Sequence, residues 1–173
     1  MKQSYKNMRD FWLDVKNLEN RRGVIELGAD KICVAGVEMV FLDGAQPKHV
    51  FVATNSLGDS SMYFENNSKS GLGGFIGGHG NVPLQEAAAK MLAHASKLTA
   101  QMTREPVGRE LPPPTAVGQV RLFAVSKENL FHIELSEEDA RNPANLFYPF
   151  FAYSQQVVGF FRTQQTSAET GKA

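Results

Sequence analysis

The chain has 173 residues, of which 42% are hydrophobic and 21% are charged, and this ordinary composition excludes a largely disordered chain or a collagen-like repeat. Lysine plus arginine and aspartate plus glutamate number 18 each, so the sequence lacks the basic excess typical of proteins that bind nucleic acids or anionic membranes. We therefore expect one folded domain over residues 1–166, a disordered tail over 167–173, and no nucleic-acid or membrane partner.

The sequence predicts a cytoplasmic protein. Its start, MKQSYKNMRDFW, lacks the apolar stretch of a signal peptide, and no apolar run approaches the roughly 20 residues that span a bilayer. Cys33 is the only cysteine, which excludes an intrachain disulfide framework and fits a reducing compartment. Because Cys33 falls within an apolar run, we expect it to be buried and inert.

The first half of the chain predicts one helix followed by a meander of strands. Apolar residues recur at spacings of three and four over 4–19, the pattern of an amphipathic helix. Apolar runs rich in Val, Ile and Phe follow at 24–27, 32–42, 48–54 and 61–65. Their connections are too short to hold a crossover helix, which predicts four antiparallel strands. The run VEMVFL, residues 37–42, should lie near the middle of that sheet, because five of its six residues are apolar.

The second half predicts a long helix, a hairpin and a last helix. The helix should cover 82–103, with Asn81 as its N-cap and Pro83 in its first turn. Residues 105–117 contain four prolines and predict an extended surface connection. Two short runs, 119–125 and 130–135, then predict a hairpin, and the last helix should run from Tyr148 to about Gln165.

Together these elements predict an α+β fold. An antiparallel sheet, made of the four-strand meander and the C-terminal hairpin, should be packed by an N-terminal, a central and a C-terminal helix. This element order loosely resembles that of several small binding folds, including profilin-like sensors and the chaperones of type III secretion. The sequence contains no motif specific to either group, so the order identifies no family.

The glycine-rich segment 71–81 is the first candidate site, because it contains six glycines and directly precedes the central helix. Backbone N–H groups at a helix N-terminus attract anions, which makes Gly77, Gly78, His79, Gly80 and Asn81 candidate ligand-binding residues. The spacing matches neither the P-loop nor the GxGxxG fingerprint. A mobile connection, or a place where backbone packs closely on backbone, explains the same glycines. Phe75 and Ile76 would be exposed there unless they dock on something, which suggests a lid.

No catalytic residue, metal site or cofactor is predicted. The sequence lacks GxSxG, paired histidines at ligand spacing and an acidic loop with calcium spacing. The acidic residues Glu137, Glu138 and Asp139 surround a helix start, where capping and the helix dipole explain them.

The last helix is the second candidate site. Its main apolar stripe predicts a core face (Phe150, Phe151, Val157, Val158 and Phe161), whereas Tyr153 and Phe160 lie off that stripe. Aromatic residues on a second side of a helix must be buried somewhere, so Tyr153 and Phe160 are candidate interface residues of a homodimer or of a complex with another protein.

Two hypotheses follow for the function. The first is a non-enzymatic binding or interaction module that dimerises through the last helix. The second is a small enzyme or sensor that binds an anionic metabolite or nucleotide at the glycine-rich segment, with His79 nearest to the ligand.

Overall fold

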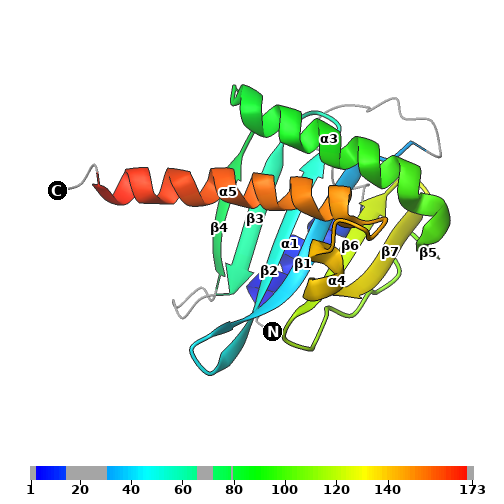
Figure 1. Ribbon diagram of the computed structural model, residues 1–173, viewed down its shortest axis with the longest axis horizontal. Helices are drawn as coiled ribbons and strands as arrows, with labels where there is room; N and C mark the ends of the chain where they lie inside the picture. The colour runs from blue at the N-terminus through cyan, green and yellow to red at the C-terminus, as the bar shows by residue number, and fades with distance from the viewer. Residues whose placement is uncertain (1–2, 15–30, 66–71, 79, 171–173) are drawn as a thin grey trace.

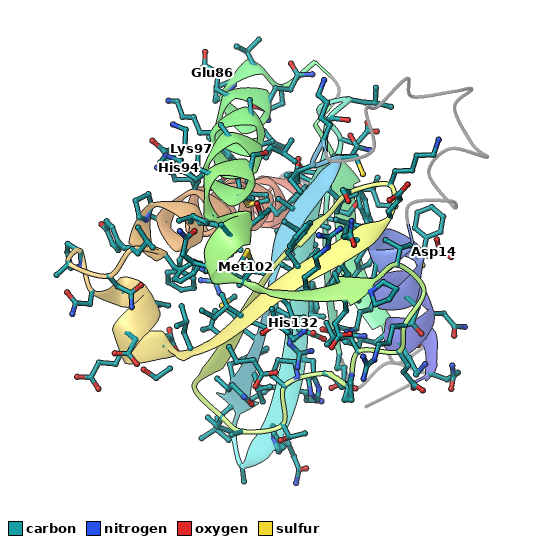
Figure 2. All side chains as sticks on the ribbon, turned by 90° about the vertical axis from the view of Figure 1, so that its right-hand side faces the viewer. Asp14, Glu86, His94, Lys97, Met102 and His132 are labelled. Carbon is teal, nitrogen blue, oxygen red and sulfur yellow. The ribbon has the colours of Figure 1, made fainter. Side chains whose placement is uncertain are left out.

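A computed structural model of the protein describes residues 3–14, 31–65, 72–78 and 80–170, and the statements below concern these residues. The chain forms an antiparallel seven-stranded sheet with the strand order β4-β3-β2-β1-β6-β7-β5. Helices α3 (Val82–Leu98) and α5 (Tyr148–Thr170) cover one face of the sheet, and α1 (Gln3–Leu13) lies on the other (Figures 1 and 2). The predicted α+β class is confirmed.

The strands arise from two antiparallel units. The meander consists of β1 (Val34–Asp43), β2 (Gln46–Asn55), β3 (Ser60–Glu65) and β4 (Leu72–Gly77). The hairpin of β6 (Gln119–Val125) and β7 (Asn129–Ser136) joins the meander because β6 pairs with β1. A seventh strand, β5 (Thr103–Pro106), pairs with β7 and ends the sheet.

Two sequence predictions about strands need correction. The segment 72–77 was expected to be part of a connection, but it is the strand β4, paired with β3 along its whole length. Residues 103–106 were assigned to a helix end and a surface connection, but they form β5. Both are edge strands, which form through backbone pairing with a neighbour and need no apolar alternation of their own. The predicted strand 24–27 lies outside the described residues.

The run VEMVFL lies in β1, the central strand of the seven, as predicted. Val37 and Val40 are buried, whereas Phe41 and Leu42 are exposed where the β1–β2 hairpin extends past the helices (Figure 1). The apolar pattern therefore located the strand correctly but did not show that its last residues extend beyond the helices and are exposed.

The helices begin close to their predicted positions, but α1, which was expected over 4–19, ends at Leu13, and residues 15–19 lie outside the described residues. Asn81 caps α3 by accepting a hydrogen bond from the Leu84 N–H, and α3 continues through a 3-10 turn over Thr99–Gln101. The short helix α4 (Glu137–Arg141) starts at Ser136, whose side chain accepts from the Asp139 N–H. Helix α5 begins at Tyr148 as predicted and continues to Thr170, which lies within the segment expected to fray. The division into a domain over 1–166 and a tail over 167–173 stays a prediction.

The sheet separates two hydrophobic cores. The larger core joins α3 and α5 to the sheet through residues such as Met91, Phe150 and Leu122. The smaller core lies beneath α1 and contains Trp12, Phe51, Phe123 and the buried thiol of Cys33. Figure 2 views the molecule from the β5 side and shows the two layers, with His94 and Lys97 of α3 on one side of the sheet and Asp14, after α1, on the other.

Candidate interaction surface

The glycine-rich strand β4 and the helix α5 lie together at one edge of the sheet, so the two candidate segments from the sequence meet in space. The Phe75 ring stacks on the Phe161 ring with centroids 6.0 Å apart, and it also contacts Phe64 of β3 at 6.2 Å. A Cβ at Gly77 would lie 3.4 Å from the Phe161 ring. Phe75 is therefore docked on its own chain, while Ile76 stays 77% exposed.

Little of segment 71–81 is left as a loop between β4 and α3. Gly78 and Gly80 both have positive φ angles, of 114° and 77°. The Asn81 side chain is already used to cap α3, and the Asn81 N–H donates to the Gly78 carbonyl. His79 lies outside the described residues. The anion site therefore stays a prediction, confined to the backbone around Gly80.

The two candidate interface residues of α5 have partners within their own chain. The Tyr153 ring stacks on the imidazole of His94 at 5.3 Å, and Lys90 Nζ lies 5.8 Å from its centroid. Phe160 is half-buried and packs against the larger core. A second aromatic side of α5 is thus partly covered by α3. That Tyr153 and Phe160 form an intermolecular interface stays a prediction.

The two edges of the sheet differ in how they are protected. β5 is a four-residue strand that contains Arg104, Glu105 and Pro106. Charges, prolines and short length are the usual means by which an edge strand avoids pairing with another chain. β4, with the sequence LGGFIG, has neither a charged residue nor a proline over its six residues. Among the described strands, β4 is therefore the edge open to further pairing.

A buried charge network on the α1 face was not predicted from the sequence. Glu38 of β1 is 1% exposed, and its Oε1 accepts hydrogen bonds from Arg9 Nε at 2.7 Å and from the Tyr5 hydroxyl at 3.3 Å. Arg121 Nη1 donates to Glu38 Oε2 at 3.4 Å, and Arg121 also pairs with Glu134. The available signal was the lone charge within VEMVFL, because a charge on a central strand needs buried partners.

The same network fastens the proline-rich segment to the sheet. Arg121 Nη1 also donates to the Pro112 carbonyl, and His49 Nε2 lies 3.0 Å from the Pro114 carbonyl oxygen. His49 Nδ1 lies 2.7 Å from Glu65 Oε2 on the neighbouring strand. Pro114 is buried, so this part of the expected surface connection packs on the domain.

The network around Glu38 stabilises the protonated form of Tyr5. Burial first, and then the negative charge of Glu38, raise the pKa of Tyr5 well above its ordinary value. Tyr5 therefore stays a neutral hydrogen-bond donor to Glu38. The arrangement holds α1 and the segment 107–117 on the sheet, and Arg9, Glu38 and Arg121 are buried within it, whereas Glu134 is exposed.

Comparison with known proteins gives no assignment, because no family model and no curated protein matches this sequence significantly. The described residues contain no group of three or more His, Cys, Asp or Glu side chains that could hold a metal ion. In the same part of the chain, no helix combines the length and apolar character needed to cross a membrane.

Proposed function

We propose that this protein is a non-enzymatic interaction module that assembles with a second copy of itself along β4, with α5 of each copy lying across the junction. The observation that carries the proposal is the unprotected edge of β4. An edge strand presents unpaired N–H and C=O groups, which another extended strand can satisfy. Pairing of β4 with the same strand of a second copy closes both open edges with one symmetric contact.

The position of helix α5 favours a second copy of this protein, rather than an unrelated extended strand, as the partner of β4. Phe161 is the last side chain packed in the core among those described up to residue 163, and the helix continues to Thr170 and projects beyond β4 (Figure 1). In a twofold arrangement around the β4 edge, the projecting ends of the two α5 helices run antiparallel on one face. Gly159 and the half-buried Phe160 then lie close to the junction, and Gly159 offers no side chain to prevent a close helix approach.

Replacing Ile76 with lysine tests the proposal. Ile76 is exposed, so the fold should tolerate the substitution, but a lysine on an edge strand opposes pairing with another chain. We expect sedimentation equilibrium to show a concentration-dependent dimer for the parent protein and a monomer for Ile76→Lys. The melting temperature measured at low concentration should be nearly the same for both.

Val117→Lys is the matched control, because Val117 is also apolar and exposed but lies between β5 and β6, away from the β4 edge. This variant should dimerise like the parent. A parent protein that stays monomeric at every accessible concentration would contradict the proposal. So would a dimer that Ile76→Lys leaves intact.

A further inference from the structure

A groove lies between α5 and the sheet, on the face that carries the larger core. It has a volume of about 270 Å³, and strands β1, β2 and β3 contribute its floor. One face of α5 is its roof, and Glu137 and Arg141 of α4 complete the lining. Figure 1 shows α5 crossing these three strands, with α4 close to its first turn.

The floor of the groove is apolar and only partly covered. Its side chains are those of Met39, Phe41, Val50, Met62 and Phe64. Met62 is buried and the others are half-buried, except for Phe41, which is 40% exposed. Methionine side chains are flexible and polarizable, so they adapt to ligands of differing shape. The floor therefore offers apolar surface that a ligand can remove from water.

The charged residues of the groove already have partners. Arg141 Nη2 lies 2.6 Å from Glu137 Oε1, and its guanidinium carbon lies 5.6 Å from the centroid of the Phe151 ring. Arg162, at the other end of the roof, also interacts within the chain. These three are the charged residues among the described residues that line the groove. An ionic ligand would therefore lose its hydration without meeting an unpaired counter-charge.

Gln155 is the uncharged polar residue of the lining. It lies on the same face of α5 as Val158 and Arg162, because the three are spaced by three and four residues. Its Nε2 donates a weak hydrogen bond to the Met39 sulfur at 3.5 Å, the one side-chain hydrogen bond that Gln155 makes to the described residues. A side-chain amide has two N–H donors and a carbonyl acceptor, so Gln155 retains the capacity to bond a hydroxyl or carbonyl group.

We infer that this groove binds an uncharged, largely apolar small molecule, whose apolar part lies on the floor and whose single hydroxyl or carbonyl group meets Gln155. The volume lies just below the range of about 300 to 1,000 Å³ for drug-sized ligands, so the ligand is smaller than these. Burial of apolar surface supplies the affinity, and the paired charges select against ions. The inference does not depend on self-association at β4.

Calorimetric titration of the full chain with 1-hexanol and 1-octanol tests the inference. 1-Octanol should bind saturably, with one site per chain, and more tightly than 1-hexanol by up to about fourfold for each added methylene that reaches the floor. Octanoate and octylammonium have tails of matching length but carry a charge in place of the hydroxyl. Each should bind more weakly than 1-octanol by about tenfold or more.

Two variants of α5 form a matched pair. Gln155→Trp places a bulky side chain in the roof and should abolish binding of 1-octanol. Gln156→Trp makes the same change at the exposed neighbouring position and should leave binding unchanged. Thermal unfolding followed by circular dichroism verifies that each variant is folded.

Three results would overturn the inference. They are no saturable binding of 1-octanol to the parent protein, an affinity for either ion that equals or exceeds that for 1-octanol, and equal affinities of Gln155→Trp and Gln156→Trp for 1-octanol. The first two are measured on the parent protein, so they decide the question even where a variant does not fold.

Discussion

Glu38 is the residue on which the α1 face of the sheet depends. Its carboxylate is enclosed by two guanidinium groups, those of Arg9 and Arg121, and by the Tyr5 hydroxyl. Arg9 is 2% exposed, and its Nη2 has no hydrogen-bond partner among the described residues. Buried charges are tolerated only when they are paired, so the arginines need Glu38 more than they would need it in water.

Replacing Glu38 with alanine should lower the free energy of unfolding by about 3 to 5 kcal/mol, because the buried guanidinium groups of Arg9 and Arg121 lose their shared buried carboxylate and keep only the more exposed Asp10 and Glu134. Urea unfolding followed by circular dichroism measures the loss. Arg109→Ala is the control, since it breaks the exposed ion pair with Glu105 and should cost less than about 1 kcal/mol. Equal losses of unfolding free energy in the two variants would show that Glu38 stabilises the α1 face no more than an exposed ion pair does.

His132 should make stability depend on pH. Burial, and then the positive charge of Arg121, lower its pKa, although Glu105 and Glu134 partly oppose this. The unfolded chain takes up this proton near pH 6.5, whereas the folded protein takes it up only at lower pH. Stability should therefore be retained above about pH 6.5 and fall as the pH drops below it.

His132→Gln should reduce this acid dependence. Urea midpoints measured between about pH 7 and pH 5 should fall less for the variant than for the parent protein. The difference between the two curves gives the contribution of His132 to the pH dependence, separately from that of the other histidines. Parallel curves would mean that the environment of His132 does not lower its pKa.

At the scale of elements, the segment 71–81 shows how one glycine cluster serves different structural purposes. In β4, a Cβ at Gly74 would lie 2.8 Å from the Met62 carbonyl oxygen, so glycine permits close backbone approach. A Cβ at Gly78 would lie 2.3 Å from the Gly58 carbonyl oxygen, at a φ of 114°. Gly80 differs, because its φ is also positive but a Cβ there would meet nothing within 4 Å. Among Gly74, Gly77, Gly78 and Gly80, whose surroundings the structure describes, Gly80 is the one with room for a ligand beside it.

If the backbone around Gly80 binds anions, Gly80→Val should abolish that binding, because a β-branched residue disfavours positive φ and blocks approach to the N–H groups. Titration calorimetry with phosphate and nucleotides at millimolar concentration measures it. Gly108→Val is the matched control, with a positive φ and equally open surroundings. Gly78→Val cannot serve, because the clash with Gly58 would distort the fold. Absence of binding to the parent protein would leave this segment as a hinge and an edge strand only.

At the scale of the whole molecule, the two faces and two edges of one sheet have different roles. The α3 and α5 layer builds the larger core and leaves the groove open below it, while α1 and the proline-rich segment enclose the charge network on the other face. One edge is short and charged, and the other is glycine-rich and apolar. No residue of β4 lines the groove under α5, so a variant of the β4 edge such as Ile76→Lys leaves the groove lining unchanged.

The sequence alone determined the α+β class, three strands of the antiparallel meander, the central position of VEMVFL and the starts of α3 and α5. These features follow from local periodicity, capping and connection length, which neighbouring residues fix among themselves. Only the tertiary structure decided the rest. LGGFIG and TREP became strands because β3 and β7 offered free backbone groups to pair with. The Tyr153 ring contacts Lys90 and His94 because α3 lies against α5. The network around Glu38 and the groove under α5 each assemble from segments far apart in the chain, and no local pattern records which distant residues will meet.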